Sequence, residues 1–217
     1  MKPDRENSSA SPFRTRAEKI EERAQKRDAV LTAAVRMFNA RGFHATSLDD
    51  VAASLGISKP TIYHYLGNKE QVLIECVTRG LEPLRAAADQ ARSEEGRGID
   101  RLRRFLIAYA RTNMDDFGRC MVRTGDELLS PPSAAEIRAR KSEIDRTLRA
   151  LIADGIADGS IAPVDVKMSA FAIAGALNWP ARWHDPNGPS SAEEIAAALV
   201  DTLIGGLAPR PCAPIRG

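Results

Sequence analysis

Residues 47–66 constrain the fold of this chain more than any other segment does. The first half of the segment has an apolar residue at every third or fourth position, namely Leu48, Val51, Ala52 and Leu55. That spacing is typical of a helix, and Gly56 ends it. The second half opens with Ser58, a favourable N-cap, and Pro60, which a first helical turn tolerates. The segment therefore predicts two helices joined by a tight glycine turn, which is the helix-turn-helix arrangement.

Capping residues mark where the helices of this region begin. Thr46 or Ser47 can cap the first helix of the pair, and Asp49 or Asp50 stands three residues later for a capping box. A preceding helix is expected from about 20 to 41, where helical spacing of apolar residues runs up to a glycine.

After the pair, the second helix is expected to end near Leu66, because Gly67-Asn68 follows it. Asn68 can then cap a further helix beginning at Lys69.

The geometry of the predicted pair points to DNA as a partner. A glycine turn lets the first helix brace the second, which can then lie in the major groove with its N-terminal side chains at the base edges. Lys59 can reach a guanine edge or a phosphate, Thr61 can meet a thymine methyl, and Pro60 offers only apolar contact. The candidate DNA contacts are Thr46, Ser47, Ser58, Lys59, Pro60, Thr61, Tyr63, His64, Tyr65 and Lys69.

Each of these residues also has a plain structural interpretation. Thr46 and Ser47 stand at a helix N-terminus, where free N–H groups bind phosphate, but capping alone explains them equally. Lys59 can be a solvated lysine. Tyr63 and Tyr65 offer hydroxyls to phosphates, and one of them can instead pack in the core, because Ile62 and Leu66 define the buried side of that helix.

The remainder of the chain keeps helical spacing, with no internal repeat and no clear strand. We expect an all-α fold of about nine helices, with Pro83 bending or dividing the helix that contains it. The further helices are expected over 99–117, over a short stretch before Pro131-Pro132, and over 133–157, 164–184 and 191–206.

The expected organisation has four parts. They are a disordered arm at 1–19, a three-helix helix-turn-helix domain at 20–70, a ligand-binding and dimerisation domain at 71–207, and a flexible tail at 208–217. Arg5, Arg14 and Arg16 of the arm can reach a DNA backbone, although a solvated tail is the favoured interpretation.

Charge and motif content narrow the function class. Residues 1–70 hold 12 Lys/Arg and 9 Asp/Glu, a net charge of +3, and the whole chain is at +2. A non-specific nucleoid protein, the alternative DNA-binding interpretation, would need a much larger basic excess, because counterion release drives such binding.

An enzyme finds no support in the sequence. There is no phosphate-binding loop, GxGxxG, GxSxG or HExxH motif, and only three histidines are scattered along the chain. The cysteines Cys76, Cys120 and Cys212 lack metal-ligand spacing. No signal peptide or membrane span is visible. We therefore expect a cytoplasmic protein with no catalytic residue, no metal, no cofactor and no membrane partner.

Within residues 28–76, the strings AVRMFNARGFHATSLDDVAASLGIS (34–58) and KPTIYHYLGNKEQVL (59–73) resemble the TetR family of bacterial repressors. The residues that carry this resemblance are Phe38, Gly42, Phe43, Thr46, Val51, Ala52, Gly56, Ser58, Thr61, Tyr63, Tyr65 and Lys69. Leu66 replaces the usual phenylalanine, and Pro60 stands where glycine is common. The resemblance implies a ligand-controlled repressor, with Lys69 as a phosphate-binding lysine.

A dimer is expected because one recognition helix reads too few base pairs to find a genomic site. Two copies related by a two-fold axis can read a palindrome. The last two long helices are the candidate interface, since residues 170–176 are small and the final helix carries an apolar stripe. Packing within one subunit is the alternative explanation for that stripe.

In this family the middle helices surround a small-molecule pocket. The candidate lining here is Leu106, Tyr109, Asn113, Phe117, Met121, Met168, Phe171 and Trp179. Such residues can equally be plain core.

The segment LNWPARWHDPNGP (177–189) is similar to a branch of the family that senses CoA thioesters, although Pro180 departs from that branch. The resemblance implies that Arg182 meets a CoA phosphate and that Trp179 or Trp183 stacks on adenine. A helix end packed by two tryptophans is the alternative.

Overall fold

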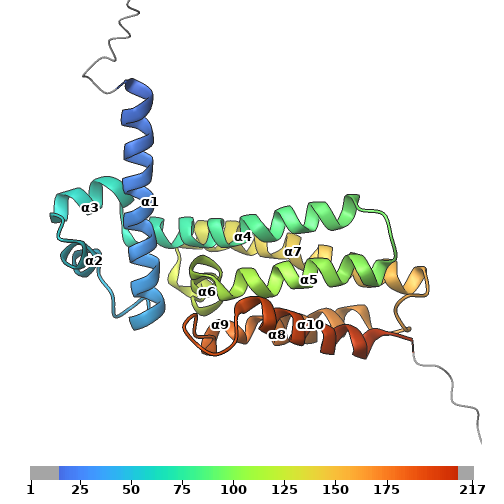
Figure 1. Ribbon diagram of the computed structural model, residues 1–217. Coiled ribbons are helices and arrows are strands. Elements are labelled where there is room, and N and C mark those ends of the chain that lie inside the picture. The colour runs from blue at the N-terminus through green and yellow to red at the C-terminus, as the bar shows by residue number, and fades with distance from the viewer. Residues whose placement is uncertain (1–14, 210–217) are drawn as a thin grey trace, which may run out of the picture.

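A computed structural model describes residues 15–209, and over this range the chain is helical without strands (Figure 1). The expected arm and tail lie mostly outside the described residues, as does Cys212. Nine helices in this range have eight residues or more, which confirms the predicted all-α class. They are α1 (Arg16–Arg41), α2 (Leu48–Leu55), α3 (Lys59–Leu66), α4 (Lys69–Ser93), α5 (Gly98–Met114), α6 (Asp116–Arg123), α7 (Pro131–Ala157), α8 (Val166–Asn178) and α10 (Ala192–Leu207). Two short turns complete the set, a 3-10 turn at Asp126–Leu128 and α9 at Pro180–Trp183.

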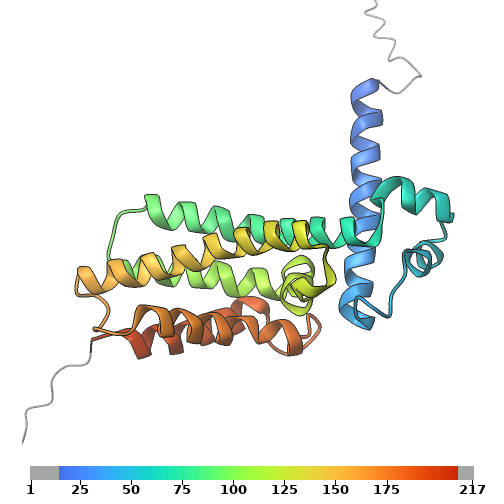
Figure 2. The ribbon, with the colours of Figure 1, turned by 180° about the vertical axis from the view of Figure 1, so that it is seen from behind.

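The helices form two groups that share α4. In Figures 1 and 2, α1, α2 and α3 gather at one end, while α5, α7, α8 and α10 run side by side away from them. α1 stands across the long direction of this second group. α4 begins beside α3 and continues along α5, α6 and α7, with which it packs. The same helix therefore belongs to both groups.

Local capping explains the helix starts in the first group. Ser47 accepts a hydrogen bond from the Asp50 N–H at 3.1 Å, and the Asp50 carboxylate accepts one from the Ser47 N–H at 2.8 Å, so Ser47 and Asp50 form the capping box of α2. Asn68 and Gln71 cap α4 in the same reciprocal way. Gly56 ends α2 with φ of 64°, a conformation that glycine adopts without a Cβ penalty.

α1 begins four residues earlier than the sequence predicts. Thr15 and Glu18 form a reciprocal capping box, with the Glu18 N–H donating to Thr15 Oγ1 at 3.2 Å. This box starts the helix at Arg16 rather than at Ile20. Residues 16–19, which were expected to belong to a disordered arm, are therefore helical.

Two boundaries in the second group differ from the prediction, and of the two outcomes predicted for Pro83, bending or dividing its helix, the second is wrong. Pro83 is exposed and sits inside an unbroken α4, so it does not divide that helix. The expected helix over 99–117 ends at Met114, because the Asp115 carboxylate accepts the Gly118 N–H at 2.7 Å and starts α6. The expected helix over 164–184 ends at Asn178, because Pro180 has no N–H to continue the ladder.

The core of the second group is continuous and apolar. Its largest fully buried side chains include Leu102, Phe105 and Leu106 from α5, and Leu148, Leu151 and Ile152 from α7. None of the described helices is both long and apolar enough to cross a membrane.

Candidate nucleic-acid interface and ligand cavity

The N-terminus of α3 carries the side chains expected to read DNA. Ser58 caps the helix, and its hydroxyl lies 2.7 Å from the Thr61 hydroxyl. Ile62 and Leu66 point into the core, at 0% and 5% exposure. The opposite side of α3, with Lys59 and Pro60, is therefore left to solvent.

Lys59 is held by a partner in the structure. Its Nζ lies 2.7 Å from Asp49 Oδ2 of α2, and this hydrogen bond raises the pKa of Lys59. The pair is exposed, so it contributes little to stability. Lys59 must exchange Asp49 for a phosphate or base edge if it binds DNA.

The two tyrosines of α3 have different environments. Tyr63 is 48% exposed, whereas Tyr65 is half-buried against the core. His64 is exposed, and its Nε2 lies 3.0 Å from Nη2 of Arg23 on α1. Of the two tyrosines, Tyr63 is therefore the more accessible to a ligand.

Thr46 is placed differently from the other candidates. Its side chain is only 1% exposed, and its hydroxyl donates to the Gly42 carbonyl at 2.9 Å. Thr46 thus fastens the turn after α1 and is not available to a phosphate, while the neighbouring Ser47 is exposed. The burial of Thr46 therefore does not support the predicted side-chain contact with DNA.

Lys69 opens α4 beside an aromatic ring. Its Nζ lies 4.3 Å from the centre of the Phe43 ring, a cation–π contact. Burial lowers the pKa of Lys69, although the charge of Asp50 opposes that shift. A cation at a helix N-terminus is disfavoured by the helix dipole, and a bound phosphate would relieve this.

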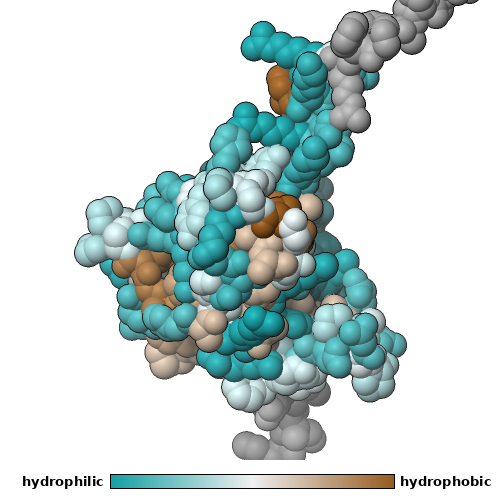
Figure 3. Space-filling view, turned by 90° about the vertical axis from the view of Figure 1, so that its left-hand side faces the viewer, coloured by the Kyte–Doolittle hydropathy of each residue, from teal (hydrophilic) through white to brown (hydrophobic). Residues whose placement is uncertain are grey.

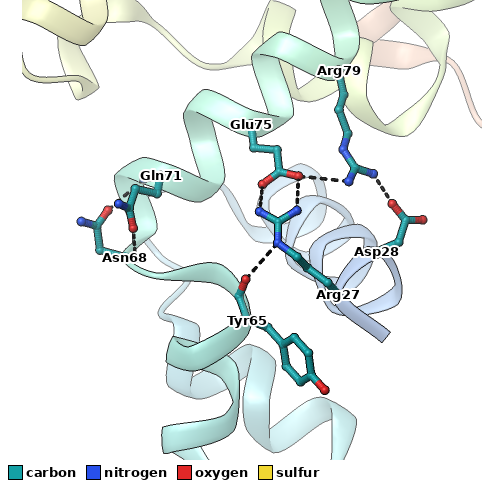
Figure 4. Close-up of polar contacts among 7 residues, drawn as sticks. All are labelled: Arg27, Asp28, Tyr65, Asn68, Gln71, Glu75 and Arg79. Atoms are coloured by element: carbon teal, nitrogen blue, oxygen red, sulfur yellow. Dashed lines mark hydrogen bonds and ion pairs between the residues drawn. The ribbon is translucent and has the colours of Figure 1, made fainter. Parts of the chain in front are cut away.

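An ion-pair network that the sequence did not suggest fastens α3 to α4 (Figure 4). Arg27 of α1 donates to both carboxylate oxygens of Glu75 and, through Nε, to the Tyr65 carbonyl at 3.1 Å. Arg79 donates to Glu75 at 3.0 Å and also pairs with Asp28. The network joins α1, the end of α3 and α4 at a single carboxylate.

The charge state of Glu75 follows from these partners. Burial alone would raise its pKa, but the hydrogen bonds and charges of Arg27 and Arg79 lower it below its ordinary value. Glu75 is therefore ionised near neutral pH and holds both guanidinium groups. Sequence periodicity gives no hint of such a contact, because Arg27 and Glu75 are 48 residues apart.

A cavity of about 410 Å³ lies between α4, α5, α6, α7 and α8. That volume is within the range of small-molecule sites. The lining comes from all five helices and the turn after α6, and consists of Leu81, Leu84, Tyr109, Met121, Val122, Thr124, Gly125, Lys141, Ile144, Asp145, Leu148, Ala174 and Asn178. Of the residues expected to line a pocket, Tyr109 and Met121 do so.

Polar groups meet where α5 and α8 close one side of this cavity. The Tyr109 hydroxyl donates to Asn178 Oδ1 at 3.0 Å, and Asn113 Nδ2 donates to the same oxygen at 2.8 Å. Burial raises the pKa of the Tyr109 hydroxyl, so it stays protonated. Asn113, which was expected to touch a ligand, lies one layer behind Asn178 and is fully buried.

The other expected lining residues lie outside the cavity. Leu106 is fully buried in the core, and Phe117 packs beside the Arg79 guanidinium, 5.4 Å from the ring centre. Phe171, Trp179 and Trp183 are 52%, 61% and 49% exposed, and Met168 and Arg182 are also exposed. The aromatic residues of α8 and α9 therefore face solvent in this single chain.

Comparisons with known proteins agree with both halves of this architecture. Residues 30–76 match the family model for bacterial regulatory proteins of the tetR family, and residues 95–207 match the model for the tetracyclin repressor-like C-terminal domain. The chain belongs to the TetR family. Its members are bacterial transcriptional regulators.

Three relatives are informative for this TetR-family chain. The transcriptional repressor KstR2 of Mycolicibacterium smegmatis is 27% identical over 187 residues, covering 85% of this chain and 91% of that protein. The structure of PfmR from Thermus thermophilus is 35% identical, with a TM-score of 0.74 over 83% of this chain and 99% of that one. AibR, in a structure with isovaleryl coenzyme A and operator DNA, is 26% identical, with a TM-score of 0.72 over 85% and 98%.

Two further contacts of the TetR-family chain involve the segment that precedes α10. Arg119 of α6 donates to the His184 carbonyl at 2.8 Å and lies 3.2 Å from His184 Nδ1. Burial and the charge of Arg119 lower the pKa of His184. These contacts tie α6 to the end of α9 next to the exposed tryptophans.

Proposed function

We propose that this TetR-family chain is a repressor that binds a palindromic operator as a dimer. In this proposal a small molecule that fills the cavity between α4 and α8 releases the protein from the operator. The proposed DNA contacts are the exposed Ser47, Ser58, Lys59, Pro60, Tyr63 and His64 and the partly exposed Thr61, Tyr65 and Lys69.

The observation that carries this proposal is the double role of α4. Glu75 holds the end of α3 through Arg27, while Leu81 and Leu84, further along the same helix, line the cavity. Glu75 and Leu81 are separated by about 9 Å along the axis, at 1.5 Å for each residue. A ligand that displaces α4 at Leu81 therefore also displaces the support of the recognition helix.

Close packing makes α4 sensitive to its neighbours. A Cβ added at Gly80 would lie 3.1 Å from the Phe117 carbonyl oxygen of α6, so the two helices approach closely at this point. Well-packed interfaces of this kind change between discrete arrangements rather than deforming continuously. A ligand wedged between α4 and α7 would select an arrangement in which α4 has moved.

The outer face of α8 supports a dimer through α8 and α10. Met168 and Phe171 of α8 are each 52% exposed. Apolar residues exposed together on one face are typical of an interface with another chain. α10 adds half-buried residues beside them, namely Ile195, Leu199, Leu203 and Ile204. A second copy of the chain covers this face in the proposed dimer.

Titration of the purified protein against DNA from upstream of its own gene tests the proposal. A discrete mobility shift that survives excess competitor DNA, with two or four chains on each site, is expected. Equal affinity for random genomic fragments would favour the alternative of a non-specific nucleoid protein. A specific binder keeps its preference at physiological salt.

An acyl-CoA is the proposed class of effector. The cavity would take the acyl group, and the exposed Trp179, Arg182 and Trp183 near its α8 side would take the nucleotide. Asn178, which lines the cavity, is the residue directly before Trp179. The likeness to AibR, whose structure contains isovaleryl coenzyme A, adds support for this class.

Release of the operator fragment by isovaleryl-CoA and longer acyl-CoA thioesters tests the effector. The variant Arg182→Ala should need a higher thioester concentration for release. An unchanged response in Arg182→Ala would show that the nucleotide site is assigned wrongly.

A second variant tests the cavity itself. Ala174→Phe should fill the cavity and abolish release without weakening DNA binding. Ala153→Phe is the matched control, because Ala153 is exposed on α7 away from the lining.

A further inference from the structure

The first turns of α1 extend beyond the helix-turn-helix. In Figures 1 and 2 this end of α1 projects past α3, on the side of the molecule opposite to α8 and α10. The segment is solvent-exposed from Arg16 to Glu21 and packs on none of the core residues. Packing in the core therefore does not explain the sequence of this helical extension.

The charges of this extension are sorted onto two sides of the helix. At about 100° for each residue, Arg16, Lys19 and Arg23 fall within an arc of about 60°. The acidic residues Glu18, Glu21 and Glu22 fall about 100° or more away from Arg23 on the same projection. Figure 3, which views the molecule from the α2 and α3 side, shows a mostly hydrophilic surface along this projection. Ile20 is an exposed apolar residue in this segment.

The basic side faces the same way as the recognition helix. Arg23 contacts His64 of α3 at 3.0 Å, and Arg27, one turn later on the same side, contacts the Tyr65 carbonyl at 3.1 Å. Arg16 and Lys19 continue this line beyond the end of α3.

These cations are not neutralised by the rest of the described chain. Between residues 15 and 209, the carboxylates of the ion pairs go to other cations, such as Lys26 with Glu22 and Arg27 with Glu75. No ion pair in that range involves Arg16, Lys19 or Arg23. A row of exposed cations on one helix side is suited to a row of phosphates.

We propose that residues 16–23 of α1 form a second DNA-binding element, which contacts backbone phosphates on the outer flank of each half-site. This inference rests on the proposed operator binding and adds a flanking contact to it. In a dimer through α8 and α10 the two extensions point away from each other, so each lies outside its recognition helix. The segment spans about 10 Å, which corresponds to about three base pairs.

Two duplexes test the flanking contact. Footprinting on DNA from upstream of the protein's own gene first defines the site. One duplex then keeps about eight natural base pairs beyond each recognition-helix contact, and the other is trimmed there, so that only the long one offers the flanking phosphates. Wild-type protein should bind the long duplex about tenfold more tightly at moderate salt.

The variant Arg16→Gln/Lys19→Gln/Arg23→Gln should lose this advantage and bind the two duplexes equally. Glutamine retains the helix propensity of the replaced residues. On the long duplex, the slope of log affinity against log salt should fall by about 2.7 for each bound chain, at about 0.9 for each phosphate that the variant no longer neutralises. The trimmed duplex should show no change in slope.

Two further variants separate the flanking contact from indirect effects. Arg16→Gln/Lys19→Gln leaves the Arg23–His64 contact intact and should still lose most of the advantage. The control variant Arg85→Gln/Arg138→Gln/Arg146→Gln removes the same amount of charge from exposed positions on α4 and α7. This variant should still bind the long duplex more tightly than the trimmed one.

Equal binding of both duplexes by wild-type protein would overturn the inference while leaving the proposed function intact. The inference would also fail if the control variant lost as much affinity as the α1 variant. Absence of any preference for the upstream DNA over random fragments would instead be a failure of the proposed function.

Discussion

The helix-turn-helix group and the cavity group of this chain reach their structures by different means. In α2, α3 and α4, each helix start is fixed by a side chain within three residues, as with Ser47 and Asp50. In α5 to α8, the arrangement depends on close approaches between distant segments. A Cβ at Gly98, for example, would lie only 2.3 Å from the backbone nitrogen of Gly155.

The two ways of forming structure suit the different functions of the two groups. The DNA-binding group needs a rigid, locally determined surface, because base contacts must be placed accurately. In the proposed function, the cavity group needs a packing that a ligand can change. α4 takes part in both, with a capped start at Asn68 and a cavity-lining middle at Leu81 and Leu84.

The largest expected effect is on the free energy of unfolding, and it comes from comparing one glycine substitution in each group. Gly118→Ala should lower the free energy of unfolding by about 3 kcal/mol, because the new Cβ would lie 1.8 Å from the Thr112 carbonyl oxygen. Gly56→Ala should cost only about 1 kcal/mol, since its Cβ meets no atom within 4 Å and only the positive φ is unfavourable. Urea unfolding of both variants measures the difference. Equal losses would contradict the distinction between the groups.

Lys59→Ala should weaken operator binding by about tenfold without changing the unfolding midpoint, because the side chain is exposed and alanine cannot bind a base edge or a phosphate in its place. Asp49→Ala is the opposing control. It frees Lys59 from its ion pair and removes a negative charge near the DNA, so it should bind more tightly. Fluorescence anisotropy with a labelled operator measures both affinities.

Glu75→Gln tests the connection between the two groups. Loss of the charged hydrogen bonds to Arg27 should cost about 1–2 kcal/mol of unfolding free energy and should loosen α3 from α4. Operator affinity should fall, and the remaining affinity should respond less to effector. Glu70→Gln, elsewhere on α4, contacts Ser130 and not α3, so it should keep the effector response. A variant of Glu75 with full effector response would show that the network does not carry the coupling.

The smallest expected effect concerns the cap of α2. Hydrogen bonds from Ser47 lower the pKa of Asp50 below its unfolded value. At pH values above the pKa of an unfolded aspartate, about 3.9, the ionised Asp50 cap stabilises the folded protein. This stabilisation is lost as the pH falls through the lower pKa that Asp50 has in the folded protein. Asp50→Asn should remove this part of the acid dependence, seen as a flatter change of melting temperature below about pH 4. An unchanged acid profile would contradict the assigned cap.

Prediction from the sequence succeeded where the relevant contacts are local. The ends of α2 and α3 were predicted correctly, because Ser58, Gly56 and Gly67 act on their own neighbours. It failed at Asp115 and Pro180, where one apolar stripe continues across a helix break. Because the spacing of apolar residues is the same on both sides of such a break, the spacing does not reveal the break.

The exposure of the candidate site residues, too, was predicted better in the helix-turn-helix group than in the cavity group. The sequence placed Lys59 at the front of α3 and Ile62 and Leu66 on its buried side, as the structure has them. It left open which of Tyr63 and Tyr65 packs against the core, and the structure shows that Tyr65 does. Phe171 and Trp179 were expected to line a pocket, but α8 buries its opposite side, including Ile173 and Leu177. An apolar side chain looks the same in sequence whether it meets core, cavity or another chain.

The sequence by itself determined the family and the recognition helix, because caps, turns and the buried stripe of a short helix act over three or four residues. Only the tertiary structure decided which side of α8 is buried, where the cavity lies and how Arg27 joins Tyr65 to Glu75. Those features depend on how whole helices pack against one another. Packing between distant segments is a property of the assembled core, and local spacing does not encode it.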